Sequence, residues 1–133
     1  MKRTAIERKK FGAWGERMAV RYLQTKGYKI LHMNWYCRWG ELDIVATKEG
    51  RIFFFEVKTR ENRVLESMTD YKFKNMLRSV QLYLKHYGYG FSNFQVDFLG
   101  IETNMSSRAK RGISSYDDPP KLVHIQNILE ARI

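Results

Sequence analysis

The fold of this 133-residue chain is decided by one stretch, which reads Gly40-Glu41-Leu42-Asp43-Ile44-Val45-Ala46-Thr47-Lys48-Glu49-Gly50-Arg51-Ile52-Phe53-Phe54-Phe55-Glu56-Val57-Lys58. Two apolar runs rich in strand-forming residues flank a short polar segment that ends in glycine, and this pattern predicts a β-hairpin. With the turn centred on Glu49 and the following glycine, the numbers of paired residues add up to 99. That register places Asp43 opposite Glu56 and Glu41 opposite Lys58.

Successive side chains of a strand point in opposite directions, so the hairpin has two different faces. One face is expected to carry Glu41, Asp43, Glu56 and Lys58 among hydrophobic positions. The other face is expected to hold Leu42, Ile44, Ala46, Phe53, Phe55 and Val57. A hairpin that is largely apolar on both faces belongs at the centre of a sheet, where an unpaired charge is costly. The charged group therefore needs a functional explanation.

A divalent metal site is one such explanation, because opposed side chains of a hairpin lie about 5 Å apart. Mg²⁺ binds one or two carboxylates together with water and phosphate oxygens. An ion held by Asp43 and Glu56 could activate water and neutralise a phosphoryl group, and Lys58 could contact that water or the phosphate. The alternative is an internal salt-bridge cluster, in which Glu41 pairs with Lys58 and Asp43 is solvated at a strand end.

Length and composition predict one domain over residues 1–133. The hydrophobic fraction of 44% excludes general disorder, and no apolar run is as long as a membrane span. Cys37 is the only cysteine, which excludes internal disulfides and suits a reducing, cytoplasmic compartment. The net charge of +10 favours a nucleic acid as partner, most simply DNA, over a membrane surface. Plain solubility is the alternative explanation of that charge.

The spacing of apolar residues predicts the remaining elements. In chain order these are a helix over 14–26, a strand over 28–36, the hairpin, a helix over 71–87, and strands over 90–101 and 122–125. Residues 102–120 are polar and rich in basic side chains, and we expect a flexible loop there. The chain shows no repeat and no domain linker.

A carboxylate on the first predicted helix lies on its inward face. At 100° per residue, Glu16 shares a stripe with Ala19 and Leu23. Gly12 and Gly15 are small enough to let the helix backbone approach its neighbours closely. The alternative is an acid that is favoured near the helix N-terminus by the helix dipole.

Basic and aromatic residues offer candidate nucleic-acid contacts. Phosphate contacts are expected from the second helix and from the basic loop, at Lys72, Lys74, Arg78, Arg108, Lys110 and Arg111. A solvated helix face explains at least two of the helical residues equally well. Trp39 could stack on an unpaired base, whereas Trp35 and the three histidines are expected to have core or surface roles.

A succession of short motifs runs through the chain: Gly12-x-x-Gly15-Glu16-x-x-Ala19-x-x-Tyr22-Leu23, Gly27-Tyr28-x-Ile30-Leu31-x-x-Asn34, Gly40-Glu41-Leu42-Asp43, Glu56-Val57-Lys58-x-Arg60, then Asp97 and His124-Ile125. Their order and spacing resemble the YraN-type family of small bacterial proteins over nearly the whole chain. More distantly, the chain is similar to archaeal Holliday-junction resolvases. Those enzymes place an acid on the first helix and then Asp and Glu-x-Lys on a hairpin.

The resemblance implies a restriction-endonuclease-like α/β fold, with a mixed central sheet, flanking helices and the core order α-β-β-β-α-β. It implies that Asp43 and Glu56 hold Mg²⁺ or Mn²⁺ and that Glu16 approaches the ion from the helix. Lys58 would orient or activate the attacking water. Two further matched positions, to which the resemblance gives no role, are Glu41 and Lys72.

These observations lead to two functional hypotheses. The first is a metal-dependent nuclease that hydrolyses phosphodiester bonds of DNA, with branched or single-stranded DNA as candidate substrates. The second is a non-catalytic nucleic-acid-binding or assembly protein that retains the nuclease fold. Without a metal ion, acids at Glu16, Asp43 and Glu56 would repel phosphates, which favours the enzyme. The sequence leaves a homodimer open.

Overall fold

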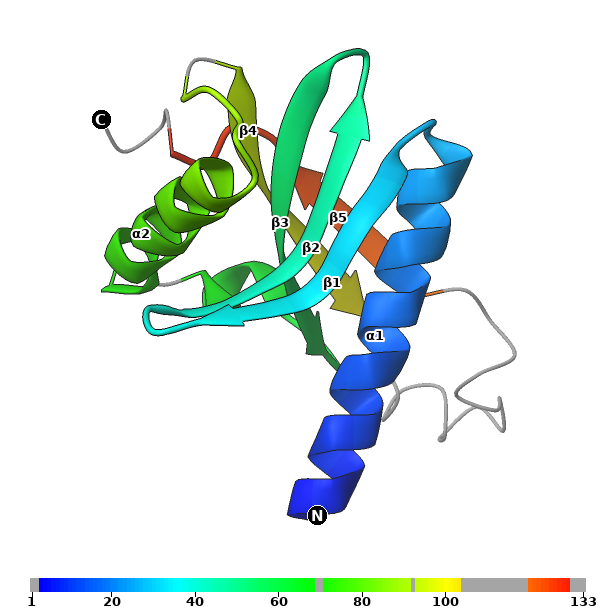
Figure 1. The fold of residues 1–133 in the computed structure, drawn as a ribbon. Helices are drawn as coiled ribbons and strands as arrows, with labels where there is room; N and C mark the ends of the chain where they lie inside the picture. Colours follow the sequence, from blue (N-terminus) through cyan, green and yellow to red (C-terminus); the bar gives the residue numbers. More distant parts are fainter. Residues whose placement is uncertain (1–2, 69–70, 92, 104–119, 130–133) are drawn as a thin grey trace.

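A five-stranded sheet with the strand order β1-β2-β3-β4-β5 forms the middle of the protein (Figure 1). The computed structural model describes residues 3–68, 71–91, 93–103 and 120–129; the side chains of residues 71–73 lie outside this description. The elements are α1 (Ala5–Thr25), β1 (Lys29–Cys37), β2 (Gly40–Lys48), β3 (Arg51–Arg60), the short 3-10 helix η1 (Val64–Ser67), α2 (Tyr71–His86), β4 (Phe94–Glu102) and β5 (Lys121–Ile125).

The central hairpin has the predicted register from its turn as far as Ile44 and Phe55, but the predicted pairs of Asp43 with Glu56 and of Glu41 with Lys58 are not part of the ladder. β2 and β3 are antiparallel, and their pairs run from Lys48 with Arg51 to Ile44 with Phe55. Glu49 and the glycine after it have φ angles of 52° and 78°, as a two-residue type I′ turn requires. β4 pairs with β3 in parallel and β5 pairs with β4 antiparallel. The hairpin is therefore central in a mixed sheet, and the predicted core order α-β-β-β-α-β is confirmed.

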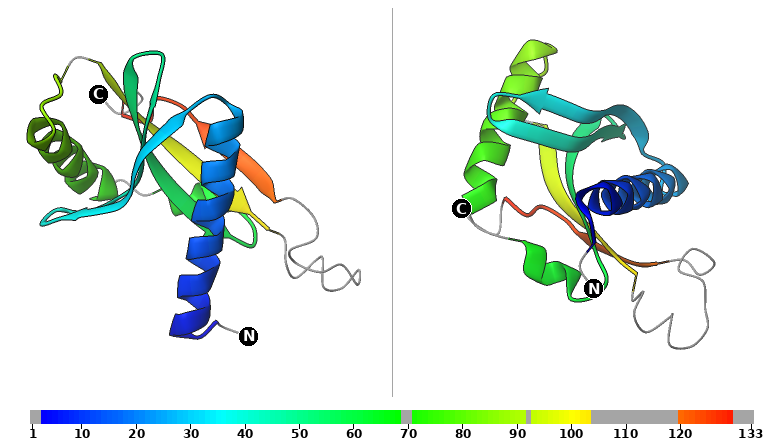
Figure 2. Two further views of the ribbon diagram at one scale, coloured as in Figure 1. Left: turned by 45° about the vertical axis from the view of Figure 1, so that its right-hand side comes forward. Right: turned by 90° about the horizontal axis from the view of Figure 1, so that it is seen from below.

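The two helices cover opposite faces of the sheet, as the view from below shows (Figure 2). α1 packs with Leu23 in a cluster that includes Phe53 and Phe55. α2 packs with Leu84 in a second cluster that includes Phe54. The alternation of large apolar residues along β3 thus supplies both halves of the core, and this places both helices beside the central hairpin.

The prediction that Leu42 lies on the same face of the hairpin as Ile44 is wrong. Ile44 belongs to the α1 cluster, but Leu42 belongs to the α2 cluster. The β2–β3 ladder ends at the pair of Ile44 and Phe55. Beyond it, the Asp43 carboxylate accepts a hydrogen bond of 2.8 Å from the backbone N–H of Val57. A side chain thus replaces a backbone partner, and the regular alternation along β2 breaks at this point.

Glycine allows the close approach of α1 to β3 at one position. A Cβ atom on Gly15 would overlap the Thr59 hydroxyl, whereas one on Gly12 would meet nothing within 4 Å. The expected close approach is therefore confirmed at Gly15 and wrong at Gly12. The helix also begins earlier than predicted, at Ala5, because Thr4 caps it by accepting a 3.1 Å hydrogen bond from the backbone N–H of Glu7.

The remaining boundaries agree with the sequence within a few residues. α2 ends at His86, before Gly88 with a φ of 77°, and β4 begins at Phe94 rather than at residue 90. Most of the expected basic loop, residues 104–119, lies outside the described part of the chain. Within the described part, no helix is both long and apolar enough to cross a membrane.

Candidate active site

Three carboxylates converge where β2 separates from β3. One oxygen atom each of Glu16, Glu41 and Asp43 lies within 4.8 Å of the other two. Glu16 comes from α1, and the close contact at the neighbouring Gly15 brings that helix against β3. Glu41 and Asp43 come from the part of β2 that pairs only with β1. Asp43 is fixed by its hydrogen bond to the backbone of Val57.

Asn34 of β1 links two of these carboxylates. With its amide oriented so that nitrogen faces the carboxylates, it donates to the two Glu16 oxygens at 3.3 and 3.2 Å and also to Glu41. Its φ of 53° is unusual within a strand and is tolerated best by asparagine among side chains of this size. Asn34 therefore holds Glu16 and Glu41 together from the edge strand of the sheet.

Glu56 and Lys58 of β3 lie next to this group. The Lys58 Nζ atom is 3.4 Å from Glu56 Oε1. Both residues line a cavity of about 280 Å³ together with Glu41 and Asp43. Trp39 and three residues of α2 complete its wall, namely Asn75, Met76 and Ser79. The cavity therefore brings the predicted Asp43, Glu56 and Lys58 to one place.

The tight carboxylate group differs from the set that the resemblance implies. Among the described residues, it contains Glu41, to which the resemblance gave no role, and it does not contain Glu56. Glu56 still acts on Asp43 through its charge. Lys58 forms an ion pair with Glu56, and its positive charge also lowers the pKa of Glu41, the partner that the salt-bridge alternative gave it.

Burial and mutual repulsion raise the pKa values of all three clustered carboxyl groups. Burial, followed by the charge of Glu56, raises the pKa of Asp43 to about 8, against the lowering effect of the Val57 hydrogen bond. Burial and then the charge of Glu16 raise the pKa of Glu41. For Glu16, burial raises the pKa and the Asn34 hydrogen bond partly opposes it. A bound cation would relieve this repulsion.

The donor atoms suit a hard divalent ion. All are carboxylate oxygens from Glu16, Glu41 and Asp43, which is the ligand type of Mg²⁺ and Mn²⁺ rather than of zinc or copper. Uncompensated ionisation is unfavourable here, as the raised pKa of Asp43 indicates. These residues could therefore hold Mg²⁺ or Mn²⁺, with Glu56 close enough to influence the ion.

A second cavity lies on the α1 side of the carboxylates. Its volume is about 490 Å³, and both Glu16 and Lys58 line it. Arg3, Arg8 and Arg60 line it as well. Lys58 thus faces both cavities. The sequence reasoning named Arg60 only as a matched motif position, and it did not single out Arg3 or Arg8, although the excess of basic residues in the first ten positions was a signal for both.

The predicted nucleic-acid contacts are only partly described. The Arg78 guanidinium lies 4.4 Å from the centre of the Trp39 ring, and Lys74 is exposed on α2. The side chain of Lys72 lies outside the described part. The same holds for the three basic loop residues, Arg108, Lys110 and Arg111.

A buried polar network ties α1 to the far edge of the sheet. Asp97 of β4 is fully buried, and its Oδ2 atom lies 2.7 Å from His124 Nε2. The other nitrogen of His124 lies 2.9 Å from the Tyr22 hydroxyl. A core or surface role was expected for His124. Its pairing with Asp97 has no local signal in the sequence, because the two residues lie 27 positions apart.

Fold and site together define an α/β protein of the nuclease-like kind, with charged residues at the open end of the central hairpin. The chain belongs to the uncharacterised protein family UPF0102, the YraN-type family, whose model matches residues 15–101. The resemblance stated from the sequence is thereby confirmed.

Relatives in this family span most of the chain. A UPF0102 protein of Syntrophomonas wolfei is 40% identical over 97 residues, which cover 70% of this chain and 84% of the relative. A UPF0102 protein of Campylobacter hominis is 38% identical over 94 residues, or 69% and 83% of the two chains. One of Mycobacterium tuberculosis is 31% identical over 129 residues, or 92% and 94%.

Proposed function

We propose that this protein is a metal-dependent nuclease that hydrolyses phosphodiester bonds of DNA. The observation that carries the proposal is the convergence of Glu16, Glu41 and Asp43. Two of these carboxylates, Glu41 and Asp43, share a cavity with the Glu56–Lys58 pair. A purely structural cluster would be expected to neutralise its charges internally. Here burial and repulsion raise the pKa of Asp43 to about 8, so the group gains from an added cation.

Each residue has a role that follows from its position. Glu16, Glu41 and Asp43 would hold Mg²⁺ or Mn²⁺, which when bound supplies a polarised water and positive charge at the phosphate. Lys58 lines both cavities, and its positively charged ammonium group can bind a phosphate oxygen or orient water there. Glu56 holds that ammonium in place. Asn34 keeps Glu16 and Glu41 in register.

The distribution of charge supports a nucleic acid as substrate. The chain has a net charge of +10, and such an excess attracts phosphate backbones. Arginines line the cavity on the α1 side of the carboxylates, and Arg78 lies beside Trp39 on the α2 side. Basic side chains therefore flank the acidic group on both sides, so a strand could cross it between favourable phosphate contacts.

The rival hypothesis is a nucleic-acid-binding or assembly protein without catalysis. Such a protein would gain from the positive charge but not from three carboxylates within 4.8 Å of one another. Without a metal ion those carboxylates repel phosphates and weaken binding locally. The enzyme hypothesis accounts for both the acidic and the basic residues, and for that reason we prefer it.

Cleavage assays with matched variants separate the two hypotheses. Linear, nicked, single-stranded and four-way-junction DNA would be incubated with Mg²⁺ or Mn²⁺. Asp43→Asn and Lys58→Ala should abolish cleavage. Above about pH 8, where the metal-free Asp43 carboxylate is ionised, Asp43→Asn should leave DNA binding equal or tighter because it removes a negative charge. Glu7→Gln and Lys29→Ala change the same types of charge at exposed positions and should leave cleavage unchanged. No cleavage of any substrate with either metal would favour the binding protein.

A further inference from the structure

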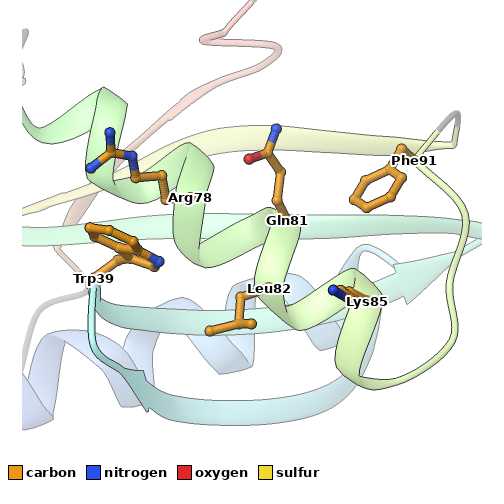
Figure 3. Close-up of a pocket in the computed structure, with 6 residues that line it drawn as sticks. All are labelled: Trp39, Arg78, Gln81, Leu82, Lys85 and Phe91. Atoms are coloured by element: carbon orange, nitrogen blue, oxygen red, sulfur yellow. The ribbon is translucent and has the colours of Figure 1, made fainter.

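A groove on the outer side of α2 lies next to the cavity of about 280 Å³ that Glu41, Asp43, Glu56 and Lys58 line, which we call the acidic cavity. Figure 3 shows Trp39 at one end and Phe91 at the other, with four residues of α2 between them (Figure 3). These four are Arg78, Gln81, Leu82 and Lys85. We refer to this set of six residues as the tryptophan groove. Its volume is about 500 Å³, within the range of pockets that bind small ligands.

We propose that the tryptophan groove binds an unpaired nucleotide of single-stranded DNA through base stacking, so that the strand cut at the acidic site is single-stranded there. This inference rests on the proposed function, for which it names the substrate class. An aromatic ring stacks on the flat face of a base, and in a continuous duplex that face is covered by the neighbouring base pairs. The groove therefore selects unpaired nucleotides.

The chemistry of the groove suits a nucleotide. Trp39 and Phe91 offer aromatic surface, and Phe91 is 57% exposed. The guanidinium groups of Arg78 and Arg38 lie 4.4 and 5.3 Å from the centre of the Trp39 ring, so a stacking base would take the place of one of them. Lys85 is exposed two helical turns beyond Arg78, about 10 Å along the helix axis. Gln81 can both donate to and accept from a base edge. None of the six residues is acidic.

Trp39 connects the groove to the carboxylates. It lines the groove together with Arg78 and also lines the acidic cavity together with Asp43 and Lys58. It stands in the two-residue turn between β1 and β2, just before Gly40. A base stacked on Trp39 would bring its own phosphate, or the next one, towards Lys58. Binding in the groove and cleavage at the carboxylates would therefore involve adjacent nucleotides.

The direct test measures binding in EDTA, so that it does not depend on cleavage. Tryptophan fluorescence would be titrated with oligothymidine and with duplex DNA of equal length. We expect quenching by oligothymidine, loss of that quenching in Trp39→Phe, and an affinity about 5- to 100-fold lower in Trp39→Ala. Duplex affinity should change little. Thermal unfolding of each variant checks the fold, and Trp39→Phe should retain part of the affinity because phenylalanine also stacks.

Salt dependence tests the charged residues of the groove. Arg78→Ala should reduce the slope of log affinity against log salt by about 0.7 for single-stranded DNA, as expected for one lost phosphate contact. Arg21→Ala removes the same charge from an exposed position on α1 and should leave the slope unchanged. Equal slopes for the two variants would remove Arg78 from the binding surface.

The outcomes separate this inference from the proposed function. Cleavage that Trp39→Ala leaves intact, together with equal affinity for single-stranded and duplex DNA, would overturn the groove and keep the nuclease. Binding of oligothymidine through Trp39 without cleavage under either metal would support the groove and overturn the nuclease. A wild-type protein that binds no single-stranded DNA in EDTA or in Ca²⁺ would overturn the groove regardless of cleavage.

Discussion

Asp43→Asn should stabilise the metal-free protein, and increasingly so as the pH rises. Burial and the charge of Glu56 raise the pKa of Asp43 from an ordinary value of 3.8 to about 8 in the folded state. Between these values the folded state holds a proton that the unfolded state has released. The stability that this proton contributes is therefore fully present below about pH 4 and is lost as the pH rises towards 8. Asparagine cannot ionise, but its side-chain oxygen can still accept the hydrogen bond from Val57.

The expected size follows from the shift. Each pH unit inside the window is worth about 1.4 kcal/mol, so pH 5 to pH 8 gives at most about 4 kcal/mol. Asp43 is only half-buried, and water that reaches its carboxylate screens the repulsion. We therefore expect the difference in free energy of unfolding, Asp43→Asn minus wild type, to increase by about 2 kcal/mol between pH 5 and pH 8.

The assay is urea unfolding in EDTA at pH 5 and pH 8, with Glu7→Gln as an exposed control. Adding Mg²⁺ at pH 8 should stabilise the wild type and leave Asp43→Asn nearly unchanged, because binding to the folded state alone adds its free energy to stability. A wild type and an Asp43→Asn variant with the same pH dependence would refute the reasoning. The same conclusion would follow if Mg²⁺ stabilised both proteins equally.

Two further predictions concern residues around the site, namely the two glycines of α1 and Asn34 of β1. Gly15→Ala should lower the free energy of unfolding by about 2 kcal/mol or more, because the new Cβ atom would overlap β3. Gly12→Ala should be neutral or should stabilise the protein by up to about 1 kcal/mol. Thermal unfolding of the two variants measures the difference. Asn34→Ala should weaken Mn²⁺ binding about 10-fold, because it removes the hydrogen-bond donor that Glu16 and Glu41 share. Calorimetry measures this affinity, and an unchanged value would contradict the role of Asn34.

The register of the central hairpin could be predicted because two independent signals agree. The pair Glu49-Gly50 marks a turn, and the apolar residues on both sides fix which strand positions face each other. Both signals are local, so one sequence is enough to read them. They led to Asp43, Glu56 and Lys58 in one cavity. Glu16 followed from helical periodicity, which is also local.

The composition of the carboxylate group could not be predicted in the same way. Regular alternation assumes that the ladder continues, whereas Asp43 ends it by bonding the backbone of Val57 with its side chain. Glu41, which was expected on the same face as Asp43, belongs to the tight group, whereas Glu56 does not. Asn34 was visible as a matched position of the family motif and as a polar residue of the first strand, and neither gave it a role. Contacts across distant segments, such as Arg78 on Trp39, depend on packing that no periodicity encodes.

The early end of the β2–β3 ladder has a consequence for local stability. Beyond Ile44, β2 pairs only with β1, and this two-stranded arm extends towards α2 (Figure 1). Two-stranded ribbons are marginal by themselves. The described contacts of the arm with α2 include the Cys37–Ser79 bond of 3.3 Å and Trp39 against Arg78. Its amides should therefore exchange with solvent before those of the paired hairpin. A metal ion bound at Glu41 and Asp43, or a nucleotide bound at Trp39, would reduce that opening.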